Sequence, residues 1–478
     1  MLFNSFEFLV YLPIVFCLYW FVFKSLRLQN LFVVVASYTF YGWWNWHFLL
    51  LIAFTSLCSY ISGVLVQNDR QLGGAKYSKF YTIANVTINL LILGVYKYYD
   101  FFAASLVESF ATIGIQLNIS SLNLILPVGI SFYTFQALSY TIDVYKGKIE
   151  PTRNIVAFFA FISFFPQLVA GPIERATNLL PQFLKSRHFD YSKAVDGTKQ
   201  ILWGLFKKMV IADNCADLVN TVWDTYTEHN SIMLIVAAIL FAFQIYGDFS
   251  GYSDIAIGTA RLFGINLKRN FNFPYFSRNV AEFWKRWHIS LNTWFVDYIY
   301  IPLGGSREGK VKKFRNTVII FLTSGLWHGA NWTFVCWGAY HALLFLPLML
   351  MGKSKNFSET VAEGRFLPTI KEAASVLFTF FLVVIGWIIF RANNITEFFD
   401  YIGHIFSNLS IAESTKYPRN TFIFIGILLL VEWLNRTKQY GLQFSLPKRW
   451  MRWSLYIVIA LAILTQAGHQ TQFIYFQF

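Results

Sequence analysis

Two histidines, His328 and His341, lie in a stretch that is otherwise apolar and aromatic, LTSGLWHGANWTFVCWGAYHALL. Ionisable side chains are rare in segments that suit a bilayer, because a charged one costs roughly 2.5 kcal/mol or more to insert. An imidazole titrates near neutral pH, so it can take up and return a proton during catalysis. The stretch therefore predicts either a catalytic base buried in the membrane or a packing histidine that bonds to a neighbouring helix.

A third histidine, His288, lies in a stretch that mixes aromatic and basic residues. The aromatic side chains recur at helical spacing with cations between them, which predicts an amphipathic helix at the membrane interface, with its basic side towards headgroups or an anionic ligand. The alternative is a solvated interfacial histidine. The stretch ends in a turn signal at 302–305. Its residues at helical spacing, and the cations between them, are Phe283, Trp284, Lys285, Arg286, Trp287, Leu291 and Trp294.

Two acidic residues, Asp248 and Asp254, lie in another apolar stretch, QIYGDFSGYSD. Gly247 and Gly251 beside them suggest a helix break with exposed backbone polar groups. Such a break is tolerated in a membrane only where protein or water covers it. We therefore predict a broken helix here, whose carboxylates either bind an ion or orient a catalytic histidine. A structural helix junction is the alternative.

The composition is that of a membrane protein. Of the 478 residues, 56% are hydrophobic and only 13% are charged, whereas soluble domains are about 25% charged. The net charge of +14 is best explained by Lys and Arg in cytoplasmic loops, not by nucleic-acid binding. The four cysteines form no C-x-x-C pair, and Cys and His nowhere cluster at ligand spacing. The sequence thus predicts neither a disulfide framework nor a metal site.

Apolar segments recur along the whole chain with only short polar stretches between them. A helix needs about 20 apolar residues to span a membrane, and several segments are shorter or broken by Gly and Pro. We therefore predict an all-α polytopic membrane protein with about 11 transmembrane helices, plus re-entrant and interfacial helices. It would form a single integral-membrane domain over 1–478. The first apolar stretch, Leu2–Phe23, has no basic n-region or cleavage site, so we expect a retained helix interrupted by Pro13.

The charges also predict an orientation. Segment 265–316 carries ten Lys and Arg residues against three acidic ones, which places it on the cytoplasmic side. Counted from Arg315 along a straight helix, His328 would lie about 20 Å from that side. A base at that depth could meet reactants that arrive from opposite faces of the membrane.

Four segments carry a resemblance to a known family. In chain order they are FPQLVAGPIER, YGDFSGYSDIAIGTARLFGINLKRNFNFPYFSRN, EFWKRWHISLNTWFVDYIYIPLGG and LWHGANWTFVCWGAYH. Together they resemble the membrane-bound O-acyltransferase (MBOAT) family, and most closely its bacterial alginate O-acetyltransferase branch. The D-alanyl transferases of teichoic acid modification are more distant. The resemblance covers nearly the whole chain. It implies that His328, in the W-H-G motif, is catalytic and that His288 is the family's second site residue.

The resemblance implies an acetyltransferase of the bacterial inner membrane. His328 would take the proton of an acceptor hydroxyl, and His288 would position donor or acceptor or stabilise charge. The implied donor is cytoplasmic acetyl-CoA, with an acyl carrier protein as the alternative, and no bound cofactor is expected. The acetyl group would cross the membrane to a periplasmic, hydrolase-like partner that completes O-acetylation of an alginate-like exopolysaccharide.

Further side chains are expected to contact substrate. The tryptophans would line a dry channel that keeps water from the acyl group. The basic side chains, with a wider basic face over 307–313, would attract an anionic donor. The predicted substrate-binding residues are Trp284, Lys285, Arg286, Trp287, Trp327, Asp248 and Asp254.

Two alternative functions remain open. The acceptor could be another envelope glycan, such as peptidoglycan, cellulose or teichoic acid, because the motifs belong to the shared chemistry. A membrane transporter would also have basic loops and buried acids. Transporters often show repeated halves, however, and this sequence shows no such symmetry. In either case the chain would contact membrane lipids and no nucleic acid.

Overall fold

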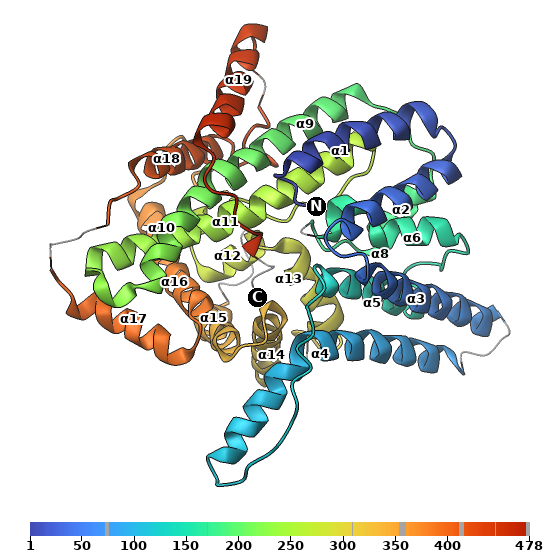
Figure 1. The fold of residues 1–478 in the computed structure, drawn as a ribbon, viewed down its shortest axis with the longest axis horizontal. Helices are drawn as coiled ribbons and strands as arrows, with labels where there is room; N and C mark the ends of the chain where they lie inside the picture. The colour runs from blue at the N-terminus through green and yellow to red at the C-terminus, as the bar shows by residue number, and fades with distance from the viewer. Residues whose placement is uncertain are drawn as a thin grey trace. The chain divides into compact units, whose positions relative to one another are not determined.

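The regular elements of the chain are helical. The computed structural model (Figure 1) contains α-, 3₁₀- and π-helices and no strand among the residues it describes, which confirms the all-α prediction. Contacts group the chain into two compact units, Met1–Gly197 with Thr259–Lys268, and Thr198–Gly258 with Arg269–Phe478. The described residues are 1–71, 76–169, 171–307, 309–352, 360–410, 415–444 and 446–474.

Several helices are long and apolar enough to cross a membrane. Among the described residues there are five: α3 (Phe48–Gln71), α4 (Ser78–Ala111), α11 (Ser231–Leu262), α15 (Trp332–Leu350) and α16 (Ile370–Arg391). A shorter apolar helical segment covers Phe6–Val22. These helices agree with a multi-pass membrane protein, while the larger predicted number of crossings stays a prediction.

The first unit contains the N-terminal helices. The interruption expected at Pro13 is not found, because α1 (Phe6–Cys17) continues through it into the π-helix η1 (Leu18–Val22). Proline is tolerated in apolar helices where neighbouring groups satisfy the freed carbonyl. After α4 the chain returns alongside that helix (Figure 1), tied to it by a bond from the Leu122 amide to Asp100. The remaining helices of this unit are α2 (Leu26–Gly42), α5 (Ile130–Tyr145), α6 (Ile155–Ser163), α7 (Phe165–Leu168) and α8 (Ala176–Phe183).

The second unit contains all three histidines of interest. Helix α9 (Tyr191–Leu205) leads into it, and α11 lies in its core. The unit also contains η2 (Phe206–Ala212), α10 (Asp213–Asp224), η3 (Tyr226–Glu228), η4 (Pro274–Phe276), α12 (Val280–Arg286), α13 (Ile289–Phe295), η5 (Val296–Tyr300), α14 (Lys310–His328), α15, α16, α17 (Ile395–Ser407), α18 (Arg419–Leu434) and α19 (Arg449–Gln466).

The helix break predicted at Gly247 and Gly251 is wrong. Helix α11 runs without interruption from Ser231 to Leu262. A Cβ atom on Gly247 would lie 2.9 Å from the Lys207 carbonyl oxygen, and one on Gly251 would lie 2.8 Å from that of Gly204. The glycines therefore serve close helix packing, for which a missing side chain is needed, and do not open the backbone.

Helices α14 and α15 form a tight antiparallel pair, and α15 packs in turn against α16 (Figure 1). A Cβ atom on Gly325 of α14 or on Gly338 of α15 would overlap the backbone of the opposite helix. Small residues of this kind let two helices approach closely. The pair positions His328 at the C-terminal end of α14 and His341 within α15.

Candidate active site

His328 lies in a cage of aromatic rings. It is the last residue of α14 and only 4% exposed. Its ring centroid lies 5.0 Å from Trp327, 5.0 Å from Trp337 and 5.4 Å from Phe390, all in edge-on contacts. The cage is built by α14, α15 and α16 together, so packing of these three helices fixes the orientation of the imidazole.

His288 lies between two short helices. The single amphipathic helix predicted here is wrong, because α12 ends at Arg286 and α13 begins at Ile289. Backbone groups of the segment at 270–272 take the place of helical hydrogen-bond partners at this gap. The Asn272 amide donates to the Arg286 carbonyl, and the Ile289 amide donates to the Asn270 carbonyl, each at 2.9 Å. His288 adopts φ 45° and ψ 52°, a left-handed conformation that is uncommon outside glycine and clusters at functional sites.

The His288 ring is buried, so the predicted alternative of a solvated interfacial histidine is also wrong. The residue is 1% exposed, and its Nδ1 lies 3.2 Å from the Asn270 side-chain oxygen. The ring contacts Phe249 at 4.6 Å and Trp327 at 5.7 Å between centroids. Burial lowers the pKa of His288 from 6.5 to about 3. The imidazole is therefore neutral at physiological pH.

His341 is the third buried histidine. Its ring lies 4.9 Å from Trp284 and 5.0 Å from Trp337 between centroids. Among the described residues, neither ring nitrogen has a hydrogen-bond partner. The contacts of His341 are thus packing contacts, and the bond to a neighbouring helix that the sequence suggested is absent from the described part of the chain.

The three tryptophans predicted to contact substrate have different positions. Trp327 contacts both His288 and His328 and so lies between these two histidines. Trp284 contacts His341 and also lines a large cavity. Trp287 packs against Trp387, at 4.9 Å between centroids, and does not line that cavity. Of the three, Trp284 lines the cavity, whereas Trp327 and Trp287 do not. Their contacts with substrate stay predictions.

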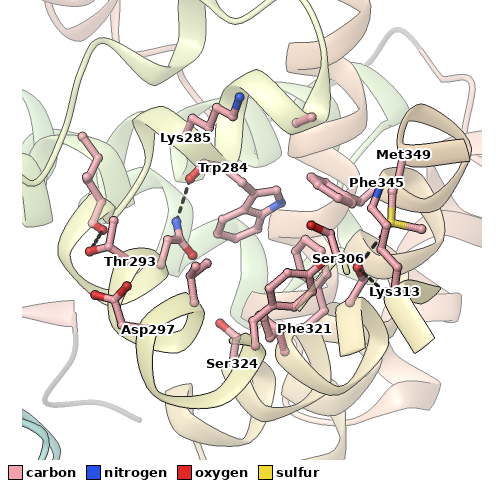
Figure 2. A pocket seen from close by; sticks show the side chains of 17 residues that line it. Trp284, Lys285, Thr293, Asp297, Ser306, Lys313, Phe321, Ser324, Phe345 and Met349 are labelled. Atoms are coloured by element: carbon pink, nitrogen blue, oxygen red, sulfur yellow. Dashed lines mark hydrogen bonds between the residues drawn. The ribbon is translucent and has the colours of Figure 1, made fainter. Parts of the chain in front are cut away.

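The large cavity has a volume of about 610 Å³. Figure 2 shows the Trp284 indole projecting across its middle, with Thr293 and Asp297 on one side and Phe345 and Met349 on the other. Ser324 lines it one helical turn before His328, and Phe345 lines it one turn after His341. Residues four apart share a helix face, so the cavity wall continues on both helices towards the histidines. The lining residues are Ala281, Trp284, Lys285, Ile289, Asn292, Thr293, Val296, Asp297, Tyr300, Ser306, Lys313, Thr317, Ile320, Phe321, Ser324, Phe345 and Met349.

The predicted cations are not equivalent. Lys285 and Lys313 both line the cavity. Arg286 points elsewhere: it is buried, and its guanidinium lies 2.8 Å from a Glu282 carboxylate oxygen. The structure thus leaves two of these cations at the cavity and places Arg286 in an internal ion pair.

Asp248 and Asp254 form ion pairs inside the second unit. Lys208 lies 2.7 Å from Asp248, and Lys207 lies 2.6 Å from Asp254. Asp248 also accepts a bond from the Ile474 amide, which ties the C-terminal segment to α11. Neither acid lines the large cavity. Both acids thus have the partners that a buried carboxylate needs for stability. The helix junction offered as the alternative is not found, because α11 is continuous over both acids.

Sequence reasoning missed one residue at this site, Asn270. It is fully buried and bonds to the His288 ring through its side chain. The two residues are 18 positions apart, and loops and two short helices, η4 and α12, lie between them. No periodic pattern connects such positions, so the contact could be found only from the fold.

The chain is similar to several known proteins. A family model described as "MBOAT, membrane-bound O-acyltransferase family" matches residues 151–390. The chain is 36% identical over 460 residues to "Probable alginate O-acetylase AlgI" of Pseudomonas aeruginosa, which covers 94% of this chain and 84% of that protein. It is 34% identical over 398 residues to "Peptidoglycan O-acetyltransferase" of Helicobacter pylori, covering 78% and 72%. It is 28% identical over 287 residues to "Teichoic acid D-alanyltransferase" of Bacillus subtilis, covering 57% and 70%.

Proposed function

Because the chain belongs to the membrane-bound O-acyltransferase family, we propose that it transfers an acetyl group from a cytoplasmic thioester donor towards a hydroxyl group of an envelope polysaccharide. The observation that carries this proposal is the position of His328. The residue is buried in an aromatic cage, one helical turn from the wall of a cavity large enough for a donor. Small-molecule sites typically enclose about 300–1,000 Å³.

The proposed reaction needs a base and a dry site. His328 takes the proton of the attacking hydroxyl while the hydroxyl oxygen bonds to the thioester carbonyl carbon. The carbon–sulfur bond then breaks, and the proton passes to the leaving sulfur to give a free thiol. The tryptophans around the ring exclude water, which would otherwise hydrolyse the thioester. Trp327 contacts His328 directly, so we assign it to this role.

The large cavity is our proposed donor site. Acetyl-CoA and an acyl carrier protein present the same arm, a pantetheine thioester with an anionic phosphate. The cavity offers apolar walls for the arm and two cations, Lys285 and Lys313, for the phosphate. Both donors therefore fit this chemistry. We propose acetyl-CoA and keep the carrier protein as the alternative.

The proposed acceptor is an alginate-like exopolysaccharide, reached through a periplasmic hydrolase-like partner from a protein of the inner membrane. This rests on the relative named as a probable alginate O-acetylase, which covers most of the chain. Peptidoglycan is the second candidate, because the relative named for it has nearly the same identity. The transporter alternative has no support in these relatives, whose names describe acyl transfer.

Acyl transfer by the purified protein in nanodiscs tests the proposal. The wild type and His328→Gln would receive radiolabelled acetyl-CoA or acetylated carrier protein, with alginate and peptidoglycan fragments as acceptors and an extract of periplasmic proteins as the source of the proposed partner. We expect His328→Gln to lose transfer by about 10²- to 10⁴-fold, the usual contribution of a positioned base. The exposed His47 provides the matched control His47→Ala. Transfer retained in a folded His328→Gln variant would refute the assignment.

A further inference from the structure

The side chain of Asn270 is an acceptor for several donors of the His288 region. Its Oδ1 lies 3.2 Å from His288 Nδ1, 3.3 Å from the Ser290 amide and 2.9 Å from the Ser290 hydroxyl. Its Nδ2 donates to the Ser253 hydroxyl of α11 at 3.2 Å. Asn270 thus joins the turn at His288 to the core helix of the second unit.

These contacts fix which end of the Asn270 amide faces His288. A backbone N–H can only donate, so the atom opposite the Ser290 amide must be the carbonyl oxygen and not the amide nitrogen. The same oxygen faces His288 Nδ1. A carbonyl oxygen cannot donate, so Nδ1 must carry the proton.

The position of this proton defines the chemistry of the ring. A neutral imidazole has one N–H and one lone pair, so in His288 the lone pair lies on Nε2. The ring is neutral because burial lowers its pKa to about 3. A lone pair accepts a hydrogen bond from a hydroxyl or takes its proton, whereas it cannot donate to a developing oxyanion.

We propose that Asn270 is the positioning residue of the site, which holds His288 as the Nδ1–H tautomer so that Nε2 acts as an acceptor in acyl transfer. This role rests on the proposed function, and it restricts the roles that His288 can have in that function. Of the roles considered for His288, stabilising negative charge through Nε2 is excluded, and binding the acceptor hydroxyl is retained. Residues that fix the tautomer of a histidine have effects of this kind in metal sites, where their loss lowers metal affinity or activity about 10- to 100-fold.

The tautomer can be measured on the wild-type protein without substrate. The protein is labelled with ¹⁵N at histidine, placed in nanodiscs and studied by NMR, and His288→Gln identifies the His288 signals by their loss. We expect a protonated Nδ1 and an unprotonated Nε2. A proton on Nε2 would overturn the proposal. Because no activity is involved, failure here is distinct from failure of the proposed function, which would appear as wild-type protein without transfer.

Two substitutions then test the role in catalysis. Asn270→Asp keeps an acceptor oxygen for the same donors, while Asn270→Leu has a similar volume and no acceptor. We expect Asn270→Leu to lower kcat at least tenfold at an unchanged KM for the donor and to shift His288 towards the Nε2–H tautomer. Asn270→Asp should keep the Nδ1–H tautomer and recover part of kcat.

A control distinguishes the positioning of His288 by Asn270 from the general effect of removing a buried asparagine side chain. Asn89 of α4 is also fully buried, and we expect Asn89→Leu to leave the His288 tautomer unchanged whatever it does to stability. An unchanged tautomer and kcat in folded Asn270→Leu would refute the positioning role. Should Asn270→Leu not fold, the tautomer of the wild type decides.

Discussion

Trp284 and His341 pack edge to face, with ring centroids 4.9 Å apart and planes at 88°. The indole lines the large cavity, whereas the imidazole does not. Trp284 therefore forms the wall between the proposed donor site and His341. Its size determines whether water that enters the cavity can pass towards the buried histidines.

We predict that Trp284→Phe increases hydrolysis of the donor at the expense of transfer. The smaller ring leaves a gap in the wall, and water in the site competes with the acceptor hydroxyl. The measurement is the ratio of free acetate to acetylated acceptor, which should rise several-fold. Trp203→Phe is the control, because Trp203 is also buried but lines a different and far smaller cavity. An equal ratio in both variants would contradict the prediction.

We predict that His288 makes the protein less stable in mild acid. His288 lies outside the five apolar helices, and burial lowers its pKa from 6.5 to about 3. Between these pH values the unfolded chain binds the proton and the folded chain does not, so the free energy of unfolding rises with pH. The contribution is fully present above pH 6.5 and is lost as the pH falls towards 3.

Thermal unfolding in detergent at pH 7.5 and pH 5 measures this effect. We expect the wild type to lose on the order of 1–2 kcal/mol more than His288→Asn between these conditions, since one pKa unit corresponds to about 1.4 kcal/mol. The difference between the two proteins cancels the other titrating groups. An equal loss in both would show that His288 is protonated in the folded protein.

The sequence alone predicts the helical class and the positions of the main chemical groups. His328 and Lys285 stand out as candidate site residues because an ionisable side chain in an apolar or amphipathic stretch is a functional-site hypothesis. Trp284 stands out because it lies in the same stretch as Lys285. Trp287 could not be separated from Trp284 in this way. Both fit helical spacing, but α12 ends at Arg286. Trp284 therefore lies within the helix, while Trp287 follows its end and has different surroundings.

The ion pairs of the core could not be predicted from the sequence, for a different reason. Lys207 and Lys208 are adjacent, yet they reach Asp254 and Asp248, 47 and 40 residues on along the chain. Their π-helical backbone and the glycines of α11 bring these groups together. Both features depend on the packing of two helices, which local patterns do not encode.

We predict that Gly338→Ala lowers both stability and activity, because it pushes the backbones of α14 and α15 apart. The added methyl group would overlap the Phe321 carbonyl, and overpacking of this kind costs about 1–3 kcal/mol. Relief requires α14 and α15 to separate, which displaces His328 from its cage. The midpoint of thermal unfolding and kcat should therefore both fall. Gly426→Ala in α18 is the matched control, because a methyl group there meets nothing within 4 Å. Equal effects in the two variants would contradict the packing argument.

We predict that Lys313→Gln weakens donor binding without slowing the chemical step. Lys313 lines the large cavity with Lys285, while His328 lies beyond the cavity wall. A half-exposed cation contributes roughly 0.5–1.4 kcal/mol to an anion, so KM should rise about two- to tenfold at unchanged kcat. The wild-type KM should also rise with salt, and that of the variant less so, because salt screens exposed charges. Lys371→Gln, an exposed cation of α16 away from this lining, is the control. A fall in kcat at constant KM would place Lys313 in the chemical step and remove it from donor binding.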